Sequence, residues 1–60
     1  MTEKQYRKQF SEGDRVLVTF EGVEREGKIL NFLSSQMVII YDNFVCDFFF
    51  YTDKPKLKKL

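Results

Sequence analysis

The side chains that could carry out catalysis are few in this chain. It contains no histidine, which removes the commonest general base and the commonest metal ligand. Cys46 is the only cysteine, so the chain alone can form neither a disulfide nor a four-ligand zinc site. Asp42 and Asp47 flank a predicted turn, where turn formation or solvent exposure explains both carboxylates. The sequence therefore predicts a protein that is not an enzyme and that holds no cofactor or metal.

Aromatic rings and lysines are the remaining side chains that could recognise a ligand. Five rings lie in the eight positions 44–51, FVCDFFFY. Residues 1–10 sum to a charge of +2, residues 11–53 to −5 and residues 54–60 to +4. The basic C-terminal segment predicts candidate nucleic-acid contacts. These are Lys54, Lys56, Lys58 and Lys59.

Alternating apolar residues predict the strands that position these groups. In 15–21, Val16, Val18 and Phe20 alternate with Arg15, Leu17, Thr19 and Glu21, as in a strand with one buried face. Gly22 is free to take positive φ in the reversal that follows. The remaining strands are predicted at 23–33, with Gly27 as a bulge, a bend or a close backbone approach, and at 37–41, 45–51 and 56–60.

Residues 1–9 are predicted to be a flexible or docked tail that forms at most a helical turn. Tyr6 and Phe10 lie four apart, so both rings can pack onto the body if the turn forms. Residues 10–60 are predicted to be a single domain. Five short strands with tight connections indicate a small antiparallel barrel.

The segment GDRVLVTFEGVEREGKIL, residues 13–30, resembles the KOW motif of the small SH3-like barrels in ribosomal proteins and transcription elongation factors. The matching residues are Gly13, Asp14, Val16, Val18, Gly22, Gly27 and Ile29. The resemblance implies a five-stranded SH3-like antiparallel barrel and contact with RNA or DNA. However, Glu21, Glu24 and Glu26 leave the first hairpin close to neutral or acidic, where nucleic-acid barrels usually carry basic residues.

Over its full length the chain is also similar to a Tudor domain. Phe10 precedes Gly13 and Asp14, and Tyr41 ends an apolar strand before a short turn. The resemblance implies a ligand rim, which would consist of Phe20, Arg25, Tyr41 and Phe44. Arg25 stands near the position of an expected ring and would repel a cationic ligand, so the resemblance implies a reader with an incomplete aromatic cage.

Alternation also divides the aromatic stretch between two faces. Cys46, Phe48 and Phe50 are predicted to point inward, with Cys46 as a small buried apolar group. The predicted inward set also includes Val16, Val18, Phe20, Ile29, Val38 and Ile40. The opposite face is predicted to be the protein-binding face. It comprises Leu17, Leu30, Met37, Ile39, Phe49 and Tyr51. A shift of register by one residue would exchange the two sets within a strand.

Three covers are open for this second apolar face: the N-terminal segment, a second copy of the chain, or a different protein. The sequence favours a non-enzymatic protein-binding module, a small accessory or regulatory protein that docks on a larger complex. The alternatives are a nucleic-acid-binding KOW-like domain that uses the basic tail, and the Tudor-like reader. No apolar run is long enough to span a membrane, and with a charged start and a lone thiol this predicts a cytoplasmic location.

Overall fold

Five strands form the body of the protein, and the computed structural model describes residues 2–60. They make one antiparallel sheet in the order β4-β3-β2-β1-β5. The strands are β1 (Arg15–Phe20), β2 (Val23–Phe32), β3 (Gln36–Tyr41), β4 (Cys46–Phe50) and β5 (Lys56–Lys59). A helix, α1 (Glu3–Gln9), precedes them, and a 3-10 turn, η1 (Tyr51–Asp53), joins β4 to β5. The predicted all-β fold of five antiparallel strands is confirmed.

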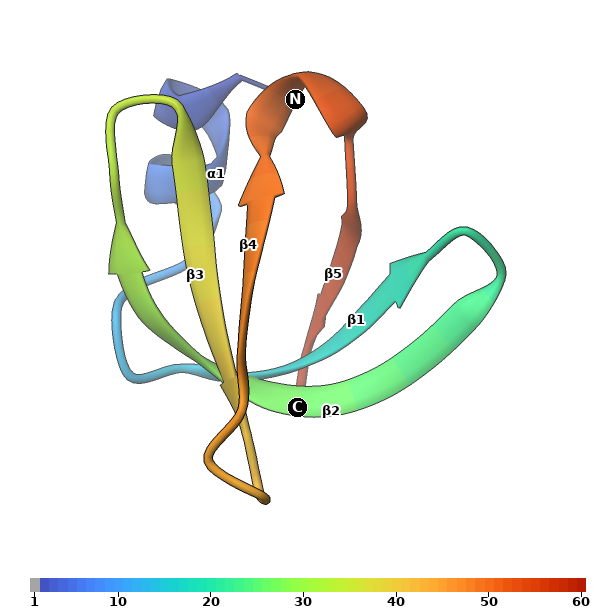
Figure 1. Cartoon of the computed structure of the whole chain (residues 1–60). Helices are drawn as coiled ribbons and strands as arrows, with labels where there is room; N and C mark the ends of the chain where they lie inside the picture. Colours follow the sequence, from blue (N-terminus) through green and yellow to red (C-terminus); the bar gives the residue numbers. More distant parts are fainter. Residues whose placement is uncertain (1) are drawn as a thin grey trace.

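The sheet is strongly curved, and its two outer strands are not paired with each other. The β1–β2 hairpin leans away from β3 and β4, and in this view β5 lies between β4 and the tip of the hairpin and ends beside β1 (Figure 1). Strands β4 and β5 each have a neighbour on one side only. The predicted closure into a barrel is therefore not confirmed, and two strand edges are left unpaired within residues 2–60.

Two glycines are required by the backbone at their positions. Glu21 and Gly22, with φ of 50° and 78°, form the two-residue reversal between β1 and β2, a turn that needs positive φ at both positions. Gly27 pairs with Tyr41 across β2 and β3. A Cβ added to Gly27 would lie 2.7 Å from Cγ2 of Ile39 and 3.0 Å from the carbonyl oxygen of Ile40. The predicted close approach at Gly27 is confirmed.

A bulge in β2 changes its alternation. Ile29 pairs with Ile39 and Asn31 pairs with Val38, so Leu30 is an extra residue on the β2 side. Because of this extra residue, the next buried side chain after Ile29 is Phe32 rather than residue 31.

The core lies on the opposite face of β3 and β4 from the one predicted. Met37, Ile39, Phe49 and Tyr51 are buried, whereas Phe48 and Phe50 are exposed. Val38 is buried as predicted, but it lies on the face of its partner Phe48 and outside the core cluster. The contiguous core cluster consists of Tyr6, Phe10, Val16, Val18, Ile29, Phe32, Met37, Ile39, Tyr41, Phe49 and Tyr51.

The physical reason for this correction lies in the pairing of β3. Ile39 is the partner of Ile29, and directly paired residues point to the same face. Val38 is the partner of Phe48, so each side chain of β4 faces the same way as its partner on β3. Cys46 and Ile40 are consequently half-buried on the outer face instead of lying in the core.

Helix α1 begins with a capping box, in which Thr2 and Gln5 bond reciprocally through side chain and backbone. Tyr6 is 1% exposed, and its ring lies 5.7 Å from the Tyr51 ring between centroids. The Tyr6 hydroxyl donates to the carbonyl oxygen of Pro55 at 2.6 Å. The helix is thereby attached to the chain next to both outer strands.

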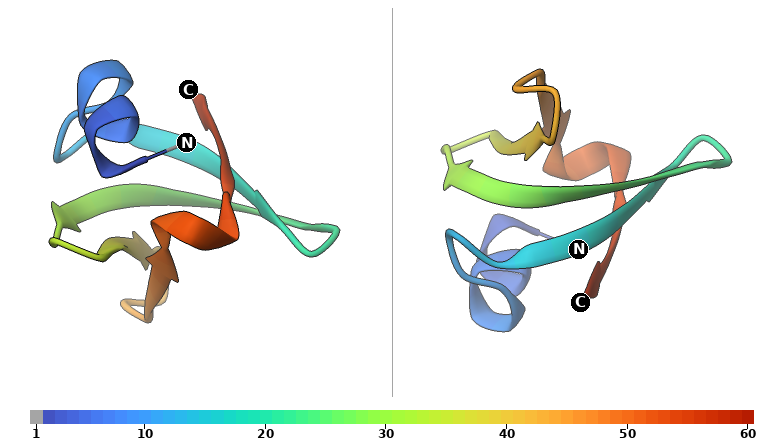
Figure 2. Two further views of the ribbon diagram at one scale, coloured as in Figure 1. Left: turned by 90° about the horizontal axis from the view of Figure 1, so that it is seen from above. Right: turned by 90° about the horizontal axis from the view of Figure 1, so that it is seen from below.

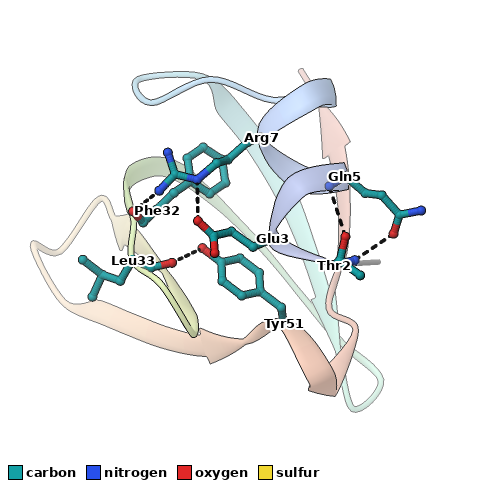
Figure 3. A network of polar contacts seen from close by, with 7 residues as sticks. All are labelled: Thr2, Glu3, Gln5, Arg7, Phe32, Leu33 and Tyr51. Carbon is teal, nitrogen blue, oxygen red and sulfur yellow. Dashed lines mark hydrogen bonds and ion pairs between the residues drawn. The ribbon is translucent and has the colours of Figure 1, made fainter.

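A polar network secures the helix to the end of β2 (Figure 3). Arg7 donates to the Glu3 carboxylate at 2.8 Å and to the carbonyl oxygen of Phe32 at 2.7 Å. The Tyr51 hydroxyl donates to the carbonyl oxygen of Leu33 at 2.7 Å. In both views of Figure 2, α1 lies toward one side of the molecule and the β3–β4 turn toward the other. The helix therefore covers an end of the core and leaves the outer face of β4 open.

Candidate functional site

Three of the four residues predicted as a ligand rim meet in one hollow, which we call the Tyr41 hollow. Phe20, Arg25 and Tyr41 come from β1, β2 and β3 and line a space of about 290 Å³. The complete lining is Val18, Phe20, Glu21, Val23, Arg25, Tyr41, Asp47 and Phe49. The Phe20 and Phe49 rings pack edge to face, with centroids 5.3 Å apart.

The chain's own guanidinium occupies the face of the Tyr41 ring. The central carbon of the Arg25 guanidinium lies 3.8 Å from the Tyr41 centroid, which is the geometry of a cation–π contact. A cationic ligand would have to displace Arg25 to reach this ring. In the Tyr41 hollow, Arg25 thus occupies the place that a cationic ligand would take in an aromatic cage.

Asp47 completes this arrangement from β4. The Tyr41 hydroxyl donates to its Oδ2 at 2.8 Å. Burial, reinforced by the hydrogen bond and the negative charge of Asp47, raises the pKa of Tyr41 to about 12, while Arg25 acts in the opposite direction. Tyr41 therefore stays protonated at neutral pH and holds β3 to β4 as a hydrogen-bond donor.

Phe44 does not join the other rim residues. It sits in the β3–β4 turn with φ of 62°, and its side chain is 85% exposed. It lines a separate space of about 280 Å³ together with the turn residue Asp42 and with Lys28. The predicted four-residue rim is therefore divided between two hollows.

The predicted protein-binding face is wrong for four of its six residues. Met37, Ile39, Phe49 and Tyr51 are between 0% and 8% exposed, so a partner has no access to them. Leu17 is half-buried on β1, and Leu30 is exposed at the bulge. The cause is the inverted facing of β3 and β4, which brings the other half of the aromatic stretch to the surface.

The residues now at the surface form what we call the β4 edge surface: Cys46, Phe48 and Phe50. Phe48 is 56% exposed and Phe50 is 49% exposed. The Tyr41 N–H donates to the Val45 carbonyl at 2.9 Å, which fixes the hydrogen-bonding phase of β4. Because this direction alternates along a strand, the backbone N–H and C=O of Cys46, Phe48 and Phe50 point away from β3. Exposed rings and outward backbone groups thus coincide on Phe48 and Phe50.

An apolar hollow adjoins one end of the β4 edge surface. It has a volume of about 530 Å³ and is walled by Phe50 and Tyr51, by the first residues of α1 and by the β2–β3 turn. The other lining residues are Thr2, Glu3, Gln5, Ser34, Ser35, Thr52 and Lys54. Phe50 belongs to both features, so the hollow extends the exposed surface beyond the end of β4.

Three of the four predicted lysines gather in another hollow, which we call the lysine groove. Lys54, Lys56 and Lys58 are all exposed and line a space of about 710 Å³. The remaining lining residues are Tyr6, Leu17, Thr19, Glu24, Pro55 and Leu57. Lys59 is not part of it, and its ammonium nitrogen lies 3.4 Å from the Asp14 carboxylate.

Sequence reasoning missed Asp47 and Phe49 as members of the Tyr41 hollow, and Phe48 and Phe50 as surface residues. The sequence holds no signal for the second pair, because the charge of Asp47 favours an outward direction for the face that Asp47 shares with Phe49. Its hydrogen bond to Tyr41 is what lets Asp47 lie on the inner side.

Within residues 2–60, no group of three or more metal-ligating side chains comes together. The same part of the chain has no helix that is long and apolar enough to cross a membrane. Searches for similar family models, curated proteins and solved structures found no match.

Proposed function

We propose that this chain is a non-enzymatic protein-binding module that docks through the β4 edge surface. The observation that carries the proposal is the coincidence of two exposed rings with an unpaired strand edge on Cys46–Phe50. Soluble proteins usually protect such an edge with charges, proline or a covering segment. The outward residues of β4, which are Cys46, Phe48 and Phe50, include no charge and no proline, and α1 does not cover them.

The occupant we propose is an extended segment of a partner protein that adds to β4 as a further strand. Main-chain hydrogen bonds to the free backbone groups of Cys46, Phe48 and Phe50 would supply affinity, and contacts with the rings would supply specificity. Two half-exposed phenylalanine rings offer roughly 200 Å². That is about a quarter of the roughly 800 Å² that one partner contributes to an ordinary interface. The backbone edge and the hollow beside Phe50 must therefore contribute as well.

A second copy of this chain fits the surface less well. Pairing β4 with its own symmetry mate extends the sheet sideways, because strands in one sheet lie side by side about 4.8 Å apart. The phenylalanine side chains of both copies would remain on the open face. A partner whose body follows its edge strand can cover that face.

Strand order and connections support an SH3-like architecture for this module. The order β4-β3-β2-β1-β5, the strong curvature and the 3-10 turn before β5 are the features behind this part of the proposal. On this basis we propose an accessory or regulatory role on a larger complex inside the cell.

The test compares two double variants in affinity capture from the native host followed by quantitative mass spectrometry. Phe48→Ser with Phe50→Ser removes both rings from the β4 edge surface. Val23→Ser with Leu60→Ser is the matched control, because both residues are 58% exposed and lie on other strands or beyond them. We expect the first variant to lose the captured partner by at least about tenfold and the control to retain it. Equal capture by both variants would refute the proposal.

Amide hydrogen exchange with the purified partner distinguishes strand addition from simple ring contact. The amides of Phe48 and Phe50 should exchange rapidly in the free chain and become protected in the complex. The amides of Asp47 and Phe49 already face β3 and should change little. If the Phe48 and Phe50 amides still exchange rapidly in the complex, no strand has been added to β4. Sedimentation of the chain alone reports whether a second copy takes its place.

A further inference from the structure

The lysine groove on the other side of the sheet has a regular array of cations over an apolar floor. Lys56 and Lys58 alternate with Leu57, so both side chains lie on one face of β5. They pair with Thr19 and Leu17 of β1, respectively. The groove is therefore built by strand register and does not depend on a disordered tail.

Lys54 joins this array through the turn that precedes β5. It caps η1 in the left-handed region, with φ of 53°, and its N–H donates to the Tyr51 carbonyl at 3.1 Å. Pro55 follows and is fully buried, with its carbonyl oxygen bonded to the Tyr6 hydroxyl. Both contacts fix the backbone from which Lys54 and Lys56 project.

Strand addition is poorly suited to this edge. The Leu60 N–H donates to the Arg15 carbonyl at 3.0 Å, so by alternation only Leu57 and Lys59 direct backbone groups away from β1. Pro55 lies immediately before β5, and three of the four residues of β5 are lysines. Proline and lysine are common means of preventing another strand from pairing with an edge. A ligand for this groove must bind to side-chain ammonium groups rather than to the strand edge.

We propose that the lysine groove binds the phosphate backbone of a single-stranded nucleic acid. Lysine ammonium groups are compact point charges that suit phosphate oxygens and need no fixed geometry. Leu17 pairs with Lys58, faces the same side as the lysines, and offers an apolar surface to bases that a single strand leaves accessible. The proposal is independent of the β4 edge surface, which lies on the opposite outer strand.

Acidic residues restrict the path that the bound nucleic acid would take across the sheet. Glu24 and Glu26 pair with Thr19 and Leu17, so they lie on the same face as the lysines but one strand beyond β1. Two strand spacings, about 10 Å, separate their backbone from β5, and the Glu24 side chain lines the far wall of the groove. This is close to the screening length of about 8 Å at physiological salt. The phosphates would therefore follow β5 and avoid β2.

The test uses fluorescence anisotropy with a labelled oligothymidylate of about 12 nucleotides, within the range of site sizes of small barrel domains. If the three lysines each neutralise one phosphate, the plot of log K against log salt concentration should have a slope of about −2. Lys56→Gln should reduce this slope by about 0.7, and the triple variant Lys54→Gln, Lys56→Gln, Lys58→Gln should abolish binding.

Lys59→Gln is the matched control, because Lys59 belongs to the same basic segment but lies outside the groove against Asp14. We expect it to bind with unchanged slope. Equal weakening by Lys59→Gln and Lys56→Gln would show that only the net charge of the tail matters and would overturn the proposal. Displacement of the oligonucleotide by a polyglutamate peptide of equal charge, at equal concentration, would assign the groove to acidic protein segments and would overturn it too. Circular dichroism of each variant checks that the fold is retained.

Discussion

The two outer strands of this sheet present opposite chemistry to solvent. Strand β4 carries Phe48 and Phe50 with unpaired backbone groups and no outward charge. Strand β5 carries lysines at three of its four positions and follows a proline. Both edges are structurally equivalent places for another strand to add, but only β5 has the residues that prevent it. The comparison shows that an edge left unprotected beside one so heavily protected is a candidate for function.

The largest expected effect comes from the residue that joins the two edges. Tyr6 packs on Tyr51 after β4 and donates to Pro55 before β5. Tyr6→Ala should lower the free energy of unfolding by about 3–5 kcal/mol. A domain of this size has only roughly 3–9 kcal/mol in total, so urea denaturation followed by circular dichroism should find it largely unfolded or close to it. Both edges would then lose their distinct behaviour together.

Tyr6→Phe separates the ring from the hydroxyl. It keeps the packing but leaves the buried Pro55 carbonyl without its donor, which should cost about 1–3 kcal/mol. If Tyr6→Ala were no worse than Tyr6→Phe, the ring would not be what holds α1 on the sheet.

Exchanging the edge chemistry should exchange the behaviour of the edges. Phe48→Lys should abolish partner capture by β4, and Lys56→Thr with Lys58→Val should make β5 prone to pair with other chains. Stability should change by only about 0.5 kcal/mol, because all three side chains are exposed. Light scattering across a range of protein concentrations measures the association. If the β5 variant stays as monodisperse as the unmodified chain, the lysines do not act as edge protection.

Alkaline pH should act on the contact that holds β4. The folded state raises the pKa of Tyr41 to about 12, above the ordinary value of about 10. A raised pKa means that stability is fully present below pH 10 and is lost as the pH rises toward 12. Thermal unfolding monitored over this range should show a falling midpoint, and Asp47→Asn should bring the tyrosinate absorbance transition to lower pH. An unchanged transition in Asp47→Asn would remove Asp47 as a cause of the shift.

Acid should act, more weakly, on the contact beside β5. The Ser11 N–H donates to Asp14 at 2.9 Å and Lys59 lies 3.4 Å away, and both lower the pKa of Asp14. A lowered pKa means that stability is present above the ordinary value of about 3.9 and is lost as the pH falls below it. Nuclear magnetic resonance titration of the Asp14 carboxyl checks the direction. Lys59→Gln should raise its pKa slightly, with the Ser11 contribution retained.

Local chemistry was sufficient to predict much of the fold. The Glu21–Gly22 turn and the close approach at Gly27 follow from what glycine alone permits, and the strands follow from alternation and turn residues. The facing of β3 could not be predicted, because residues 37–41 are apolar at every position and therefore fit either face. Only the pairing of Ile29 with Ile39, a contact between distant residues, decides it.

The candidate sites show the same division. Phe20, Arg25 and Tyr41 line one hollow, but Phe44, whose backbone is left-handed, lines a separate one. The lysines could be identified as a group from composition, whereas the separation of Lys59 from the others depends on strand parity and on Asp14. The exposure of Phe48 and Phe50 depends on the facing of β3, so it could not be seen in the sequence.

The hydrogen bond from Tyr6 to Pro55 also bears on the order of folding during synthesis. It joins residues 49 positions apart, so Tyr6 is made well before its partner Pro55. Seven helical residues are too few to persist alone in water. The helix is therefore made before the segment that holds it, and the newly made chain exposes Tyr6 until residues 51–55 are in place.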